Sequence, residues 1–141
     1  MHLTSRAMLP VFLFIAGCGH WFPSVDIAYR GSGDERILEF MRGNYMSSEE
    51  GVARYLRRQL EDGLQPGQAI DQAYLVRRGA LCSEGIALVC SFSGVANERF
   101  YGLPKENAWR ARRITTIEAR VILEQPVRIE VVKTARYPDE R

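Results

Sequence analysis

The sequence predicts an α+β domain in which two or three N-terminal helices pack on one face of a small antiparallel sheet of about four strands. Apolar residues recur at helical spacing between residues 34 and 79, and they alternate with polar residues from 115 to 131. Helices followed by strands are typical of an antiparallel sheet whose polar face stays in contact with water. The 141 residues suffice for one such domain with a hydrophobic core.

Three segments in the first half of the chain are expected to be helical. The first spans 34–42, where the apolar positions fall on one side and a glycine follows. The second opens at a capping box formed by Ser47 and Glu50 and stops at Gly63. The third spans 66–79, since it begins at a proline and ends at a glycine.

The second half of the chain is expected to form the sheet. Strands are predicted over 81–82 and 86–92, joined by a short polar turn. The polar stretch 94–107 contains glycine and proline and is predicted to be a long loop. Two further strands are predicted over 115–123 and 127–131, where the alternation is clearest.

The last two predicted strands imply a register. If Leu123 faces Val127 across a turn at Gln125-Pro126, Arg120 lies opposite Glu130 on the polar face of the sheet. Opposite charges at directly facing positions stabilise an antiparallel pair of strands.

The N-terminus carries a short apolar run with a basic residue before it. The run spans 7–17, follows Arg6 and contains Pro10. It is too short to cross a bilayer, which takes roughly 20 residues. A basic start, a short apolar centre and small residues at its end are typical of a secretory signal.

The apolar run ends in Ile15-Ala16-Gly17-Cys18, which resembles the lipobox of bacterial lipoproteins, with Ile where Leu is more usual. The resemblance covers residues 1–18. It implies that a peptidase cuts before Cys18, that the Cys18 thiol carries a diacylglycerol, and that the new amino terminus is acylated. Two or three acyl chains anchor a protein firmly in a membrane. The alternative is an apolar helix of a cytosolic protein that contains a cysteine by chance.

The resemblance also predicts the organisation and location of the chain. It divides the sequence into a signal peptide (1–17), a lipidated tether (18–33), a single α+β domain (34–137) and a polar tail (138–141). Gly19 stands where Asp commonly retains such lipoproteins at the inner membrane of Gram-negative bacteria. In a Gram-negative host, the resemblance therefore implies the outer membrane, on its periplasmic side.

The cysteine content agrees with export. The chain has three cysteines, and lipid on Cys18 would leave Cys82 and Cys90 to form a disulfide bond in an oxidising compartment. The alternative is that both are buried free thiols. Their spacing does not resemble a metal site, because there is no second pair and no nearby histidine.

The sequence offers little for catalysis or for nucleic acid. His2 lies in the signal peptide and His20 lies in the predicted tether, so neither is held beside other groups. We therefore expect no enzyme activity, no catalytic residue, no metal and no cofactor. The net charge of +2 gives no strong field toward nucleic acid.

One cluster of basic and aromatic residues is a candidate ligand site. It comprises Trp109, Arg110, Arg112 and Arg113, with Arg99 shortly before it. Arginine interleaved with aromatic rings can bind polyanions or planar carboxylates. The alternative is a solvated strand edge whose basic residues prevent unwanted pairing.

The expected function is that of a non-enzymatic protein-binding or structural module in the cell envelope, attached to the membrane through Cys18. In its size, predicted location and order of elements, the chain resembles the small lipoproteins that accompany the outer-membrane protein assembly machine. That resemblance implies an envelope protein partner bound through the sheet edge or the helical face. Two alternatives remain: a binder of lipopolysaccharide or peptidoglycan through the arginine cluster, and an inhibitor or immunity-type lipoprotein.

Overall fold

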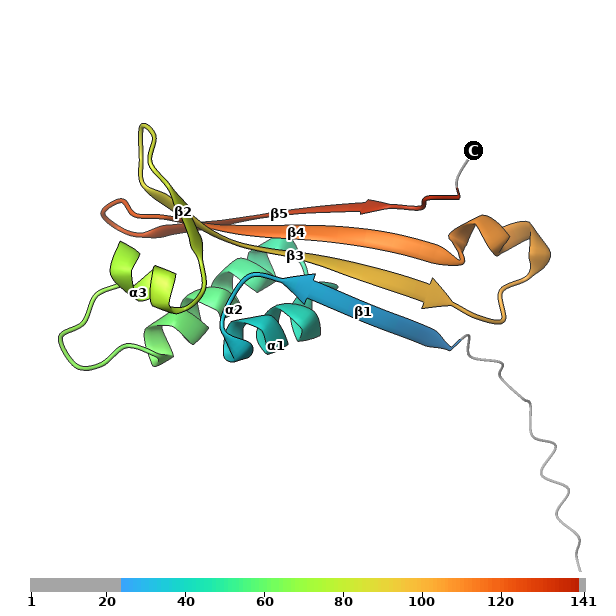
Figure 1. The fold of residues 1–141 in the computed structure, drawn as a ribbon, viewed down its shortest axis with the longest axis horizontal. Helices are drawn as coiled ribbons and strands as arrows, with labels where there is room; N and C mark the ends of the chain where they lie inside the picture. Colours follow the sequence, from blue (N-terminus) through green and yellow to red (C-terminus); the bar gives the residue numbers. More distant parts are fainter. Residues whose placement is uncertain (1–23, 140–141) are drawn as a thin grey trace, which may run out of the picture.

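The computed structural model describes residues 24–139, which form an α+β fold built on a five-stranded antiparallel sheet (Figure 1). Its elements are β1 (Val25–Gly31), α1 (Glu35–Asn44), α2 (Glu49–Asp62), α3 (Gln72–Arg77), β2 (Leu81–Ser83), β3 (Val89–Phe100), the 3-10 helix η1 (Lys105–Arg110), β4 (Arg112–Ile122) and β5 (Arg128–Arg136). The strand order is β1-β3-β4-β5, and β2 also pairs with β3. The predicted signal peptide, Cys18 and the first part of the predicted tether lie outside the described residues.

The core lies between the helices and one face of the two central strands. Alternate side chains of β3 and β4 are buried, because successive strand residues point to opposite faces. They pack with apolar side chains from all three α-helices. The largest fully buried side chains are those of Phe92, Ile37, Met41, Leu56, Leu60, Leu75, Ile117, Val52, Val121 and Cys90. Figure 1 shows β1, β3 and β4 extending past α1 and α2 toward η1.

Helix α2 begins one residue later than the sequence predicts. The Ser48 side chain, not that of Ser47, accepts a hydrogen bond from the Gly51 backbone N–H at 3.1 Å. The predicted capping box of Ser47 with Glu50 is therefore wrong. Because Ser48 is the cap, Glu49 is the first helical residue, and its side chain bonds to strand β5 instead of to the helix end.

Helix α3 is shorter than the predicted helix over 66–79. Asp71 caps it by accepting a hydrogen bond from the Tyr74 backbone N–H at 2.7 Å. Gly67 has a φ of +77°, a left-handed conformation that interrupts a right-handed helix. The predicted helix start at Pro66 is therefore wrong, because the first residue whose side chain caps the helix is Asp71.

Strand β1 corrects the predicted tether over 18–33. Residues 25–31 form an edge strand that pairs with β3, from Val25 opposite Phe100 to Gly31 opposite Gly94. Glycines and a proline flank this strand, as they would flank a tether, and the strand that it pairs with lies far away in the sequence. The local sequence therefore did not indicate a strand here. The domain therefore includes β1 and does not begin at residue 34.

Strand β3 corrects the predicted loop over 94–107, because it continues unbroken to Phe100. Gly94 lies inside the strand for a packing reason. A Cβ atom there would collide with the hydroxyl and ring of Tyr29 on the neighbouring strand. The glycine therefore makes room for an aromatic ring that fills the missing side-chain space. With β1 added to the four predicted strands, the sheet has five strands instead of about four.

The predicted register of the last two strands is confirmed. Arg120 lies opposite Glu130 in the β4–β5 pair. The charged groups nevertheless bond along each strand, with Arg120 3.0 Å from Glu118 and Arg128 3.2 Å from Glu130. The register is therefore as predicted, while the closest ion pairs are with neighbours two residues away.

The predicted disulfide bond is also confirmed. Cys82 and Cys90 are directly opposite each other in the β2–β3 pair and are joined by a disulfide. Cys90 is fully buried among the core side chains. The bond therefore fastens the short strand β2 to the centre of the sheet.

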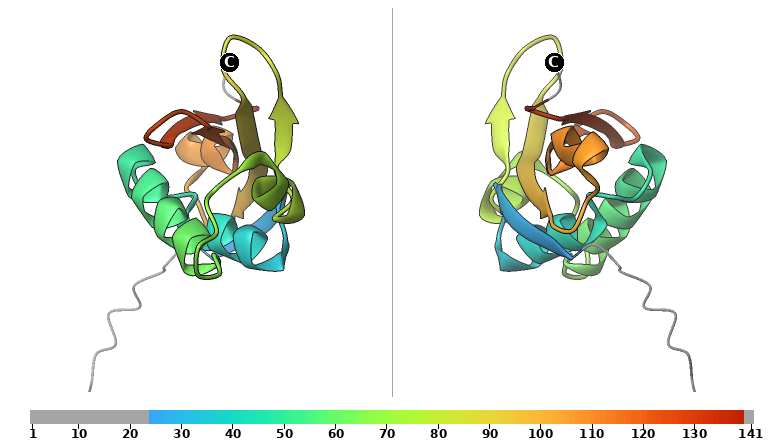
Figure 2. Two further views of the ribbon diagram at one scale, coloured as in Figure 1. Left: turned by 90° about the vertical axis from the view of Figure 1, so that its left-hand side faces the viewer. Right: turned by 90° about the vertical axis from the view of Figure 1, so that its right-hand side faces the viewer.

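The two edges of the sheet differ. Helix α2 lies along β5, while β1 forms the opposite side of the sheet (Figure 2). The Lys133 backbone N–H of β5 donates to Glu49 Oε1 at 2.8 Å, and the Arg57 side chain donates to the Val127 carbonyl at 2.7 Å. The Lys133 ammonium group donates to the carbonyl oxygens of Tyr45 and Ser47. Part of the β5 edge is therefore occupied by hydrogen-bonding partners from α2 and fixed against the turn before α2.

Candidate functional site

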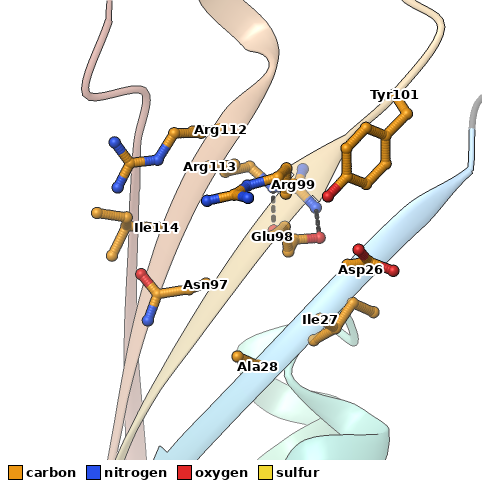
Figure 3. Close-up of a pocket in the computed structure, with 10 residues that line it drawn as sticks. All are labelled: Asp26, Ile27, Ala28, Asn97, Glu98, Arg99, Tyr101, Arg112, Arg113 and Ile114. Carbon is orange, nitrogen blue, oxygen red and sulfur yellow. Dashed lines mark hydrogen bonds and ion pairs between the residues drawn. The ribbon is translucent and has the colours of Figure 1, made fainter.

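A pocket of about 310 Å³ lies where the sheet extends past the helices (Figure 3). Strands β1, β3 and β4 and the residue after β3 supply its walls. Its polar lining includes Asp26, Asn97, Arg99, Tyr101 and Arg112. These residues bring together one carboxylate, two guanidinium groups, an amide and a phenol, all of which can hydrogen-bond to a polar ligand.

The pocket has an excess of positive charge. Arg99 and Arg112 face each other directly across β3 and β4, and Asp26 faces Arg99 from β1. Like charges at facing positions destabilise a sheet. Asp26 balances one of the two guanidinium groups, so an anion bound between the arginines would relieve the remaining repulsion.

Arg113 lies on the opposite side of β4 from Arg112, because adjacent strand residues alternate. Its Nε and Nη2 atoms donate to the Glu98 carboxylate at 2.5 and 2.6 Å (Figure 3). Glu98 is buried, and the Tyr45 hydroxyl donates to the same carboxylate at 2.9 Å. The hydrogen bonds from Arg113 to Glu98 raise the pKa of Arg113 despite its partial burial. Arg113 therefore neutralises a buried acid and stabilises the fold.

Trp109 and Arg110 lie in η1, outside the pocket. The Arg110 guanidinium is 4.5 Å from the centre of the Trp109 ring, and the Trp109 ring meets the Tyr137 ring edge-on at 5.2 Å. These contacts occupy both side chains with each other and with the end of β5.

The structure therefore divides the predicted cluster into three parts, which are Trp109 with Arg110 in η1, Arg112 in the pocket, and Arg113 in the ion pair with Glu98. Of its four members, Arg112 and Arg113 line the pocket, and Arg113 does so while paired with Glu98. Sequence reasoning missed Asp26 and Asn97, because both lay in segments predicted to be tether and loop. The alternation along β1 and β3 is the signal that could have identified them.

The buried Tyr45 and the partly buried Tyr29 make the fold sensitive to high pH. Burial raises the pKa of Tyr45 to about 12, and the hydrogen bond to Glu98 adds to this effect. Burial likewise raises the pKa of Tyr29 to about 12. The folded protein therefore favours the neutral phenols more strongly than the unfolded chain does, where the pKa is near 10.

We expect the free energy of unfolding to be constant with respect to these groups below pH 10 and to fall as the pH rises toward 12. The sign follows from the raised pKa values, since deprotonation is easier in the unfolded chain. Urea unfolding at a series of alkaline pH values measures the loss. Tyr45→Phe should flatten part of the decline, whereas Tyr55→Phe, at an exposed position, should leave it unchanged. An identical decline in both variants would contradict this assignment.

Within residues 24–139, no group of three or more His, Cys, Asp or Glu side chains is placed to hold a metal ion, and no helix is both long and apolar enough to cross a membrane. Comparison of the chain with protein-family models, with curated proteins and with solved structures finds no match.

Proposed function

We propose that the protein is a lipid-anchored lipoprotein of the bacterial envelope and acts as a non-enzymatic protein-binding module. Acyl chains on Cys18 hold it in the outer membrane, and its domain faces the periplasm. The helices pack on one face of the sheet, and the opposite face binds the partner.

A shallow groove on that opposite face carries the proposal. The groove has a volume of about 490 Å³ and crosses β3, β4 and β5. Small side chains form its floor, including Ser93, Thr116 and Thr134, beside Val95 and the half-exposed Val132. Arg30 and Glu118 also line the groove. A broad, open surface that carries both apolar and polar groups is compatible with a non-obligate protein interface, whereas small-molecule sites are more enclosed.

The proposed location is supported by two separate observations. Ile15-Ala16-Gly17-Cys18 has the residue types of a lipobox and follows a short apolar run with a basic start. The bond between Cys82 and Cys90 suits an oxidising compartment, where disulfides form and persist.

The intact mass of the protein extracted from its own membranes tests this location. We expect a chain that lacks residues 1–17, carries acyl groups and gains two hydrogens when its disulfide is reduced. Cys18→Ser should keep residues 1–17 and carry no lipid. An unprocessed, unmodified wild-type chain would overturn the proposed location.

Photo-crosslinking in cells tests the binding face. A photoreactive residue in place of Thr116, which is exposed in the groove, should form an adduct with one envelope protein. The same residue in place of Arg58, which is exposed on α2, is the matched control and should give no such adduct. Equal adducts at both positions, or none at Thr116, would contradict the assignment of this face.

A second candidate function is supported by the arginine pair in the pocket. Arg99 and Arg112 face each other, and of the two carboxylates in the pocket only that of Asp26 is not paired with Arg113. Paired guanidinium groups suit the phosphates of lipopolysaccharide or the carboxylates of peptidoglycan. The double variant Arg99→Ser/Arg112→Ser should then bind these ligands at least tenfold more weakly. Arg36→Ser/Arg58→Ser removes the same charge from exposed helix positions and is the control. Equal binding by both double variants would exclude this function.

A further inference from the structure

Strand β1 has a free edge in the described part of the chain. It pairs with β3 on one side, and no other strand within residues 24–139 pairs with its second side. Proteins usually protect a free edge with charged side chains (lysine above all), proline or a bulge, because its unpaired backbone groups attract other strands. The seven residues of β1 include neither proline nor lysine, and their register with β3 is continuous. Their two charged residues, Asp26 and Arg30, have opposite signs and can therefore pair with a complementary strand.

The hydrogen bonds to β3 determine which residues of β1 face outward. The Tyr101 backbone N–H donates to the Ser24 carbonyl at 2.9 Å. At the other end, the Ser32 backbone N–H donates to the Ser93 carbonyl at 2.8 Å. Bonded positions alternate along an antiparallel strand, so the even-numbered residues bond to β3. The free edge therefore presents the backbone groups of the odd-numbered residues Val25, Ile27, Tyr29 and Gly31.

A second copy of β1 can pair with this edge along its whole length in one antiparallel register. Full overlap of residues 25–31 places Ala28 opposite Ala28 of the second copy, and it aligns odd-numbered residues with odd-numbered residues, as the hydrogen bonds require. Asp26 then faces Arg30 of the second copy, and Arg30 faces Asp26 of the second copy. Shifting the register by two residues in either direction loses both charge pairs.

A groove beside the free edge fits the exposed apolar side chains of the same strand. The groove has a volume of about 720 Å³ and lies between β1 and α1, with Tyr29, Gly31 and Leu38 in its lining. Val25 and Ile27 are 43% and 47% exposed and lie on the same face of β1 as Tyr29, because side chains alternate. In the register with full overlap, Ile27 of the second copy pairs with Tyr29, and Val25 of the second copy pairs with Gly31. The groove would therefore receive both side chains.

We propose that two copies of the chain associate through their β1 strands around a two-fold axis at Ala28. The two sheets then form one continuous sheet. The charge pattern selects a second copy as the occupant, because one short strand supplies both the acid and its matching base. This association goes beyond the proposed function and does not depend on lipid at Cys18.

Disulfide crosslinking tests the register directly. Ala28 would occupy a non-hydrogen-bonded pair, in which the Cα atoms lie about 4.5 Å apart, and a disulfide can bridge that distance. The full chain with Ala28→Cys, purified in mild detergent and oxidised, should run as a covalent dimer on a non-reducing gel. Asp26→Cys and Arg30→Cys should not, because each thiol would lie about 13 Å along the strand from its own counterpart. The wild-type chain controls for crosslinking through Cys18.

A charge exchange tests the pairing of Asp26 with Arg30. Asp26→Arg should weaken the dimer by about tenfold or more, since it places like charges opposite each other twice in each dimer. Asp26→Arg/Arg30→Asp should restore the dissociation constant to within about threefold of the wild type. Both variants place an arginine opposite Arg99, so the double variant controls for any effect on the single chain. Sedimentation velocity in the same detergent measures the dimer.

A proline substitution blocks the edge without disturbing β3. Ile27→Pro removes an N–H that points away from β3, and edge strands tolerate proline at such positions. We expect this variant to be monomeric with an unchanged circular dichroism spectrum. A monomeric wild-type chain at micromolar concentration, crosslinking at residue 26 or 30 instead of 28, or a dimer unaffected by Asp26→Arg would each overturn the proposal.

Discussion

Replacing Arg113 with alanine is expected to lower the free energy of unfolding by about 3 to 5 kcal/mol. The Glu98 side chain is 3% exposed, and Arg113 supplies two of its hydrogen bonds. Without Arg113, a buried carboxylate would keep its hydrogen bond from Tyr45 but lose its counter-charge. Removing one partner of a buried ion pair is costly because the other charge is left uncompensated. Urea denaturation followed by tryptophan fluorescence measures the change.

The neighbouring residue provides the matched control. Arg112→Ala removes the same charge from an exposed position on the opposite face of β4, so its cost should stay within about 0.5 kcal/mol. Adding Glu98→Gln to Arg113→Ala should recover part of the loss, because the unpaired charge is then absent. Equal losses from Arg112→Ala and Arg113→Ala would show that the buried pair does not stabilise the fold.

Replacing Cys82 with alanine is expected to lower the free energy of unfolding by about 2.5 kcal/mol. The bond between Cys82 and Cys90 closes a loop of about nine residues, and its loss frees the unfolded chain to explore more conformations. Cys82 is the residue to replace, because Cys90 is fully buried in the core and its removal would also leave a cavity.

Chemical reduction gives an independent measure of the same bond. The wild-type chain treated with dithiothreitol should unfold at the same urea concentration as untreated Cys82→Ala. Dithiothreitol should have no effect on the variant itself. A variant as stable as the oxidised wild-type chain would show that the crosslink contributes nothing to stability.

Local features of the sequence predicted part of the fold correctly. The register that sets Arg120 opposite Glu130 depends on a short turn and a clear alternation. The disulfide joins strands that follow each other directly, so the cysteine count and the predicted export led to the correct pairing of Cys82 with Cys90.

Long-range pairing explains what the sequence did not reveal. β1 is stabilised by β3, whose residues lie some seventy positions later, so the local composition of 18–33 read as a tether. Gly94 read as part of a loop because the Tyr29 ring that covers it belongs to that distant strand. Neither β1 nor the end of β3 is recognisable as a strand from its own residues, because each is stabilised by pairing with the other.

The cluster of basic and aromatic residues predicted as a ligand site is divided in the structure, and long-range pairing is again part of the reason. The cluster from Trp109 to Arg113 looks continuous in the sequence, but η1 ends at Arg110 and β4 begins at Arg112. Strand alternation then sends Arg112 and Arg113 to opposite faces. The structural role of Arg113 depends on Glu98, which lay in the segment predicted to be a loop.

The difference between the two sheet edges limits how large an assembly can become. A sheet with two accessible edges can add strands repeatedly and grow into a fibre. In the described part of this chain, Glu49 and Arg57 bond to backbone groups of β5 and of the turn before it, whereas β1 is accessible. In the proposed dimer the two β1 edges pair with each other, and the backbone groups that Glu49 and Arg57 occupy at the β5 side are not free to accept a further strand. Helix α2 therefore disfavours strand addition at the β5 side, so association at β1 favours pairs of molecules over longer chains of them.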